Sequence, residues 1–326
     1  MSNRRRFIGF ILLGMVSLLL SWEGAAVAAN LEKTKLKVGV SVPSVAFLPL
    51  YVGVEEKLFQ NEGLEVEVLA FRSTTDNTSA LASKSIDINA TGFEGVLTPR
   101  NQGLDIKMFY ALCNRPVYQW YSKPEIKSIK EAKGKKFAVS KIGSPSDVMT
   151  RWVVRKAGLD PAKDIQILQV GAPLERLSAL VSGGVDVAIL SEPGTFMAER
   201  KGYNLLLSLD DFIKGFPLEV YASFVQFIKA NPETLKAFLR GNNKAIEVLR
   251  ANQEKALSAI KKYLKVEGED AVKAYQGYRD SYPIDGVPPL DGIDMVQEIT
   301  VESGEMKSKL PLTELIDYTY INFFKK

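Results

Sequence analysis

The chain contains an internal repeat, and this repeat restricts its fold more than any other feature. The segment SALASKSIDINA begins at Ser79, and SALVSGGVDVAIL begins 99 residues later at Ser178. At the same offset, KVGVS from Lys37 matches KFAVS from Lys136. Because 326 residues are also enough for about two domains, the two copies predict two similar structural units.

Each copy has the pattern strand, helix, strand, helix, strand, from apolar runs with β-branched residues and apolar residues at helical spacing. In the first copy we predict strands at 36–41, 64–70 and 86–90 with helices at 49–59 and 76–83; in the second, strands at 136–140, 164–170 and 185–190 with helices at 147–157 and 174–182. Alternating strands and helices form parallel sheets with right-handed crossovers. The fold class is therefore α/β, with two lobes.

Two strand-rich segments, 108–121 and 218–228, are candidate hinge strands between the lobes. From Asn231-Pro232, a helix-starting pair, the pattern becomes helical, and we expect this tail to pack on the first lobe. The expected boundaries are 30–114 and 224–326 for lobe 1, and 115–223 for lobe 2.

The first 29 residues have the pattern of an export signal. Three arginines at 4–6 precede an apolar run over 7–20, and AVAA at 26–29 is a small-residue cleavage pattern. The run is shorter than the roughly 20 apolar residues that a membrane-spanning helix needs. We therefore expect a signal peptide over 1–29, its cleavage, and a periplasmic location.

Composition narrows the possible functions. Residues 1–29 hold three arginines and one glutamate, so the remaining chain has 39 basic and 37 acidic residues, a balance that predicts no binding to nucleic acid. The single cysteine, Cys113, cannot form an internal disulfide. The chain has no histidine, which removes the commonest general base and the commonest zinc ligand. We expect a monomer with no cofactor, no metal and no catalytic residues.

Several segments resemble one family of proteins. They are FLPLYVGVEEKLFQNEGLEVEV from residue 47, SALASKSIDI from 79, IKSIKEAKGKKFAVS from 126 and KAGLDPAKDIQILQVG from 156. These segments resemble periplasmic solute-binding proteins of ABC importers, in the branch named for nitrate, sulfonate, taurine and thiamine-precursor uptake. The resemblance implies a type II periplasmic-binding fold, in which two lobes joined by two crossover strands close around a solute and present it to a membrane permease.

Ligands of open α/β sheets bind beyond the carboxyl ends of the strands, so the loops after the strands of each copy are the expected cleft. Small residues, hydroxyls and two aromatic rings there suit a pocket for a modest organic molecule. The predicted ligand-binding residues are Ser44, Phe47, Ser73, Thr74, Gly92 and Phe93 in the first copy, Arg115 at the first crossover, and Gly143, Ser144, Ser146 and Glu192 in the second copy.

Some of these residues have purely structural alternatives. Phe47 and Phe93 can be core residues, which is the commoner place for a phenylalanine. Ser73 and Thr74 can cap the helix that follows them. Arg115 offers a planar fork of donors to a carboxylate, sulfonate or phosphate, or else it stands in solvent.

The second copy leaves similar alternatives open. Glu192 would repel an anion and favour an N–H donor such as an aminopyrimidine, unless an arginine or lysine neutralises it. Ser144 and Asp147 have the spacing of a capping box around Pro145. Alternatively, Gly143 allows close approach, and the serine hydroxyls and free N–H groups of the first helical turn hold the polar end of a ligand.

Three functions are consistent with these segments and residues. The first is a solute-binding subunit of an ABC importer for a small organic anion, such as a sulfonate or carboxylate, or for a nitrogen heterocycle. The second is a periplasmic sensor that delivers its ligand to a receptor protein. The third is an enzyme on the same fold, because a eukaryotic branch that makes the thiamine pyrimidine resembles these proteins. That branch relies on an active-site histidine, which this chain lacks.

Overall fold

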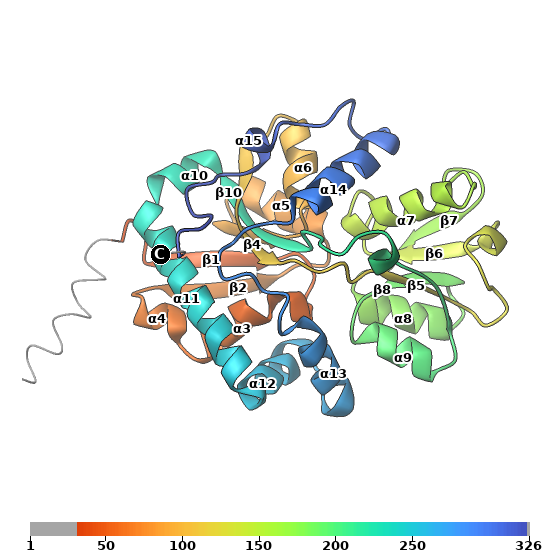
Figure 1. The fold of residues 1–326 in the computed structure, drawn as a ribbon, viewed down its shortest axis with the longest axis horizontal. Helices are drawn as coiled ribbons and strands as arrows, with labels where there is room; N and C mark the ends of the chain where they lie inside the picture. Colours follow the sequence, from red (N-terminus) through yellow and green to blue (C-terminus); the bar gives the residue numbers. More distant parts are fainter. Residues whose placement is uncertain (1–30, 325–326) are drawn as a thin grey trace, which may run out of the picture.

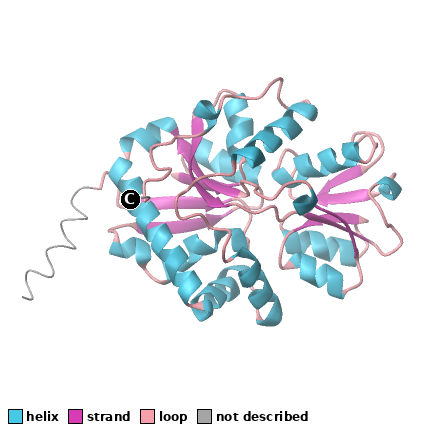
Figure 2. Cartoon of the chain, in the orientation of Figure 1, coloured by secondary structure: helices cyan, strands magenta, loops and turns pink. Residues whose placement is uncertain are grey.

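The computed structural model describes residues 31–324, so the predicted signal peptide over residues 1–29 lies outside the described residues. Two α/β lobes lie side by side, and each is built on a five-stranded sheet covered by helices (Figures 1 and 2). Within residues 31–324, none of the helices combines the length and the apolar character that crossing a bilayer requires.

The sheet of lobe 1 has the order β2-β1-β3-β10-β4. Its strands are β1 (Lys35–Val40), β2 (Glu65–Ala70), β3 (Ile88–Thr91), β4 (Ile106–Cys113) and β10 (Glu219–Phe224). Strand β1 is parallel to β2 and β3, whereas β10 runs antiparallel to both β3 and β4. The side chains of Leu36, Val38 and Val40 are buried, which explains the alternating apolar pattern at the start of the repeat.

The sheet of lobe 2 has the order β7-β6-β8-β5-β9, the same arrangement. Its strands are β5 (Gln119–Ser122), β6 (Lys136–Val139), β7 (Gln166–Gln169), β8 (Val187–Leu190) and β9 (Asn204–Ser208). Here β5 is the antiparallel fourth strand. The chain thus crosses between lobes after β4 and again before β10. The second crossing comes before Glu219, earlier than the expected boundary at 223/224, because the whole of β10 pairs within the first sheet.

An aspartate at the same position of each copy makes the same contacts in both lobes. In lobe 1 the Asp87 carboxylate accepts a hydrogen bond from the Lys37 amide at 2.9 Å. In lobe 2 the Asp186 carboxylate accepts from the Lys136 amide at 3.0 Å. Each carboxylate also forms an ion pair with a lysine, so the same residue fixes the start of the first parallel strand in both copies.

The helices of the two copies follow the predicted order. They are α3 (Leu48–Glu55), α4 (Leu58–Asn61), α5 (Thr74–Ala82) and α6 (Glu94–Asn101) in lobe 1, and α7 (Pro145–Lys156), α8 (Pro173–Val181) and α9 (Gly194–Arg200) in lobe 2. The helix expected over 49–59 is in fact two helices. It is interrupted because Lys57 adopts a left-handed conformation, with φ of 57°.

The C-terminal part is helical, as predicted. It comprises α10 (Val225–Ala230), α11 (Pro232–Ala251), α12 (Gln253–Leu264), α13 (Gly268–Tyr278), α14 (Leu290–Glu302) and α15 (Leu312–Leu315). Helices α11 and α12 pack on α3 of lobe 1. Helix α11 also packs on α4, where the rings of Phe59 and Phe238 stack at 5.1 Å. Helix α14 also packs against α7, so the tail contacts both lobes (Figure 1).

Candidate functional site

A cavity lies between the lobes, at the carboxyl ends of the parallel strands. Its lining residues come from lobe 1 (Ser41, Val42, Ser44, Thr74, Glu219, Tyr278), from the crossovers (Val117, Tyr118, Leu218) and from lobe 2 (Ser140, Pro145, Ser146, Pro173, Arg176, Ser191). The cavity volume is about 40 Å³, which is room for a few water molecules. Pockets for organic ligands are usually some 300 Å³ or larger, so such a ligand requires the lobes to move apart.

Arg176, on α8, supplies the buried positive charge of the cavity wall. Only 3% of the residue is exposed, and its Nε and Nη1 donate to the carbonyl oxygens of Ile189 and Gly171 at 2.7 and 2.6 Å. Among residues 31–324, no carboxylate lies within ion-pair distance of it, and Nη2 has no hydrogen-bond partner. Burial lowers the pKa of Arg176 to about 10, so the guanidinium stays protonated at neutral pH. The Glu175 carboxylate is near enough to favour the charged form of Arg176 but forms no ion pair with it. A buried cation without an ion-pair partner attracts an anion or a strong acceptor.

Two buried carboxyls stand on the lobe 1 side. Glu219, the first residue of β10, lines the cavity, and its Oε2 is buried without a partner in the described chain. Glu94, the first residue of α6, has both carboxyl oxygens buried and equally unpartnered among these residues. Burial raises the pKa of Glu94 to about 7. Burial and the nearby Glu94 carboxyl raise the pKa of Glu219 well above its usual range.

A cluster of serine hydroxyls forms the lobe 2 wall where α7 begins. The Ser146 hydroxyl accepts from the Ser140 amide at 2.9 Å, and the Ser140 hydroxyl donates to that of Ser144 at 2.7 Å. Ser140 and Ser146 line the cavity, whereas Ser144 is fully buried behind them. Helix dipoles favour negative charge near a helix N-terminus, so this wall suits the acceptor end of a solute.

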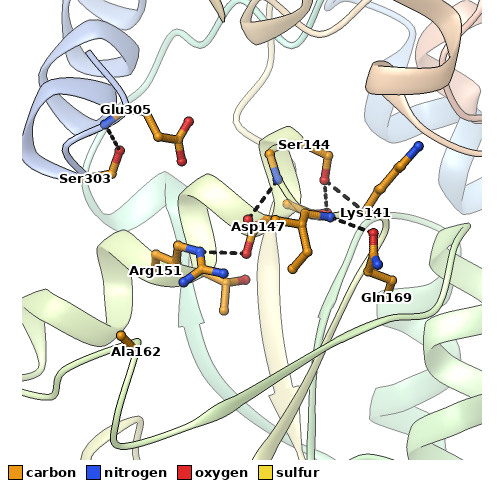
Figure 3. Close-up of polar contacts among 12 residues, drawn as sticks. Lys141, Ser144, Asp147, Arg151, Ala162, Gln169, Ser303 and Glu305 are labelled. Carbon is orange, nitrogen blue, oxygen red and sulfur yellow. Dashed lines mark hydrogen bonds and ion pairs between the residues drawn. The ribbon is translucent and has the colours of Figure 1, made fainter. Parts of the chain in front are cut away.

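The capping box, one of the two alternatives for Ser144, does not form. The Asp147 amide bonds to the backbone oxygen of Ser144, and the Ser144 hydroxyl makes no cap bond. Instead, the Asp147 carboxylate accepts from the amide of Gly143 and from Nε of Arg151, both at 2.9 Å (Figure 3). Gly143 has φ of 75°, so its role in the structure is to turn the loop.

The fold agrees with comparisons to known proteins. A model of the family described as NMT1/THI5 like matches residues 44–256. The chain belongs to the NMT1/THI5-like family. Its two lobes and two crossovers have the type II periplasmic-binding fold.

Two relatives of this NMT1/THI5-like chain illustrate the range of the family. YtlA of Bacillus subtilis, whose name describes a candidate binding protein, is 24% identical over 97% of this chain and 96% of its own length. A 4-amino-5-hydroxymethyl-2-methylpyrimidine phosphate synthase of Schizosaccharomyces pombe is 21% identical over 61% of this chain and 60% of its own length.

Two solved structures are similar in fold. The alkanesulfonate-binding protein SsuA of Xanthomonas axonopodis, bound to MOPS, has a TM-score of 0.72 and 16% identity, covering 88% of this chain and 99% of SsuA. The periplasmic nitrate-binding protein NrtA of Synechocystis has a TM-score of 0.64 and 19% identity, covering 75% of this chain and 70% of NrtA.

In this NMT1/THI5-like chain, the predicted site residues fall into three groups according to their place relative to the cavity. Ser44, Thr74 and Ser146 line the cavity. Phe47 and Phe93 are fully buried in the apolar core. The remaining residues lie around the cavity and do not line it: Ser73, Gly92, Arg115, Gly143, Ser144 and Glu192.

Ser73 and Arg115 have partners within the protein. The Ser73 hydroxyl caps α5 by accepting from the Asp76 amide at 3.1 Å. Arg115 and Glu192 form a two-point ion pair, with Nη1 to Oε2 at 2.9 Å and Nη2 to Oε1 at 2.8 Å. The guanidinium also lies over the ring of Tyr278, 4.9 Å from its centroid. Because Arg115 neutralises Glu192, the Glu192 carboxylate gives no preference for a solute with an N–H donor.

Sequence reasoning missed Arg176, Glu219 and Tyr278. The repeat itself carried a signal for Arg176, because the equivalent position in the first copy is Asn77. The Asn77 amide donates to the carbonyl of Ala90, as Arg176 does to that of Ile189, the matching position. A charged residue thus replaces a neutral one at a buried position of the repeat. Glu219 and Tyr278 lie outside the repeat, so no comparison between the two copies could identify them as site residues.

Proposed function

We propose that this chain is a periplasmic solute-binding protein of an ABC importer. In this role it takes a small organic solute between its lobes and presents it to a membrane permease. The observation that carries the proposal is Arg176, a buried guanidinium that faces a cavity between two lobes and lacks a carboxylate partner in the described residues. The family, the type II fold and the expected export signal support the same role.

Reversible closure of the lobes is the proposed mechanism of capture. The rims of the cleft are joined by ion pairs, Arg72 to Glu175 at 3.3 Å and Lys141 to Asp76. Such exposed pairs contribute roughly 0–1 kcal/mol each, so they stabilise the closed arrangement of the lobes only weakly. Closure around a solute would remove water from Arg176 and strengthen its interaction with an acceptor.

The anionic or acceptor end of the solute is assigned to Arg176. Two proteins of similar fold are named for the anions that they bind, an alkanesulfonate and nitrate. In this chain, Arg176 and the serine hydroxyls at the start of α7 are among the donors on the cavity wall that are available to such a group. The assignment to Arg176 replaces Arg115, whose donors are occupied by Glu192.

An enzyme is the second candidate, because one relative is named as a pyrimidine phosphate synthase. The chain has no histidine, and the resemblance noted from the sequence links that enzyme branch to an active-site histidine. Binding without chemistry is therefore the better supported role. A periplasmic sensor would use the same cleft, and copurification with a permease rather than with a receptor would distinguish the two.

A thermal-shift screen of the chain without residues 1–29, against sulfonates, carboxylates, nitrate and aminopyrimidines, tests the proposal. A solute at 100 times its Kd stabilises the folded state by about 2.7 kcal/mol. The variants Arg176→Gln and Arg176→Lys should weaken binding of the best hit by at least about tenfold, the range for hydrogen bonds to charged groups. The matched control is Arg240→Gln, which removes an arginine paired with Glu62 outside the cavity. Absence of any hit, or equal affinity in Arg176→Gln, would contradict the proposal.

A further inference from the structure

The lobe 1 wall of the cavity has two polar groups that the described protein leaves unpartnered. Glu219 is 8% exposed and Tyr278 is fully buried, and both residues line the cavity. Oε2 of Glu219 and the hydroxyl of Tyr278 have no hydrogen-bond partner among residues 31–324. A buried polar atom without a partner costs about 1–3 kcal/mol, so both atoms favour a ligand group that can satisfy them.

The two walls differ in the groups that they offer. Lobe 2 presents the guanidinium of Arg176, which can only donate hydrogen bonds. Lobe 1 presents the carboxyl of Glu219, with the Glu94 carboxyl close enough to affect its ionisation. In this structure Arg176 and Glu219 do not form an ion pair with each other, although both line a cavity of about 40 Å³. A solute that lies between them would therefore meet a cation on one side and an acceptor on the other.

We infer that the solute carries both an acceptor or anionic group, which Arg176 holds, and an amine or N–H edge, which Glu219 receives. This inference rests on the proposed function and specifies its substrate class. A solute with an anionic group alone would offer no N–H donor to Oε2 of Glu219 and would place like charges near each other whenever Glu219 is ionised. Glu219 is thus the residue that discriminates between amino-bearing solutes and simple anions.

Matched pairs of probes that differ only in an amino group test this inference by isothermal titration calorimetry. The pairs are 2-aminoethanesulfonate with ethanesulfonate, β-alanine with propionate, and 4-aminopyrimidine with pyrimidine. In at least one pair we expect the amino member to bind at least about tenfold more tightly, because a buried site rejects a ligand that leaves its polar groups unpaired. The advantage should fall by about tenfold or more in Glu219→Gln.

Two further variants keep the test interpretable. Tyr278→Phe retains the ring beneath Arg115 and removes only the unpartnered hydroxyl, so a smaller loss of amine preference is expected. Glu62→Gln, whose carboxylate pairs with Arg240 away from the cavity, should leave the preference unchanged. Circular dichroism and thermal melts establish that each variant is folded.

The outcomes separate this inference from the proposed function. Equal or tighter binding of the amine-free members would overturn the inference and leave solute binding intact. Amine preference that persists unchanged in both Glu219→Gln and Tyr278→Phe would overturn the assignment to lobe 1. If no member of any probe pair binds, the inference is also overturned. The thermal-shift screen with Arg176→Gln would then decide the proposed function by itself.

Discussion

Gly92 of lobe 1 lies directly against Pro145 of lobe 2. A Cβ atom added to Gly92 would stand 2.9 Å from Cγ of Pro145, a distance shorter than carbon atoms tolerate, and 3.2 Å from Oε2 of Glu94. Gly92 follows β3 and Pro145 begins α7, so this contact joins the carboxyl edges of the two sheets. The absence of a side chain at residue 92 allows the lobes to approach.

The substitution Gly92→Ala should therefore hinder closure. Overpacking of a tight contact costs about 1–3 kcal/mol. The clash with Pro145 arises only in the closed state, whereas the contact with Glu94 lies within lobe 1 and is present in both states. We expect solute affinity to fall by about 5- to 100-fold, and thermal stability without solute to fall by a smaller amount, because the contact with Glu94 lies within lobe 1. Small-angle scattering at saturating solute should show a larger radius of gyration than for the unsubstituted protein. Gly184→Ala, where a Cβ would meet nothing closer than 3.5 Å, is the control.

The ion pair between Arg115 and Glu192 should act in stability rather than in solute binding. Both side chains are mostly buried, with 24% and 13% of their surface exposed. Removing one partner leaves the other charge buried and unpaired, which is costly. In urea melts, Arg115→Gln and Glu192→Gln should each destabilise the protein, and the double variant should cost about 0.5–3 kcal/mol less than the two together. Additive effects, or a specific loss of solute affinity in Arg115→Gln, would show that Arg115 holds solute instead.

Ser144 and Ser146 should differ in their effect on binding. Ser146 lines the cavity and accepts from the Ser140 amide, whereas Ser144 is buried behind it and makes no cap bond to α7. Ser146→Ala should weaken solute binding by about 5- to 10-fold, equivalent to about 1–1.4 kcal/mol. Ser144→Ala should leave affinity nearly unchanged. Calorimetric titration of the best solute measures both, and an equal loss in the two variants would contradict this difference.

The repeat made the fold predictable, because strand and helix periodicity depends on local sequence. The repeat predicted both lobes and the order of their elements, and helical periodicity predicted the helical tail. The division of the 49–59 helix at Lys57 was not predictable, since a left-handed lysine has no sequence signature. The boundary between the lobes near β10 differed for another reason: a local apolar run does not show which sheet it joins, and only pairing with β3 and β4 places β10 in lobe 1.

The site was less predictable than the fold because it depends on contacts between distant residues. Loop position identified Ser44, Thr74 and Ser146 on the cavity wall. It could not show that Glu192 meets Arg115 across 77 positions of sequence. Nor could it show that Tyr278 of the tail reaches the cleft, because tail packing brings that residue to the cavity.

Glu94 should make the stability of the protein depend on pH. Its carboxyl is buried without a hydrogen-bond partner in the described chain, and burial raises its pKa from 4.5 to about 7. Between these two pH values the folded protein retains a proton that the unfolded chain has lost. The free energy of unfolding therefore falls as pH rises from about 4.5 to 7 and levels off above that range. A shift of this size corresponds to ~3 kcal/mol at pH 8.

The variant Glu94→Gln has nearly the same shape and no charge, so it should remove this contribution. Urea unfolding at pH 5 and pH 8 measures the effect in both proteins. At pH 5 the two should differ little, because the Glu94 carboxyl is mostly protonated when folded. At pH 8 the variant should be more stable by up to ~3 kcal/mol. The Glu94 carboxyl must then either carry a buried charge or bind a proton at a pH above its pKa, whereas the glutamine amide does neither. The Glu219 carboxyl is present in both proteins, and its pKa is raised by burial and by the nearby Glu94 carboxyl, so the difference between their pH profiles reports Glu94 together with its coupling to Glu219. Parallel profiles, with the same offset at both pH values, would show that Glu94 has the same proton affinity folded and unfolded.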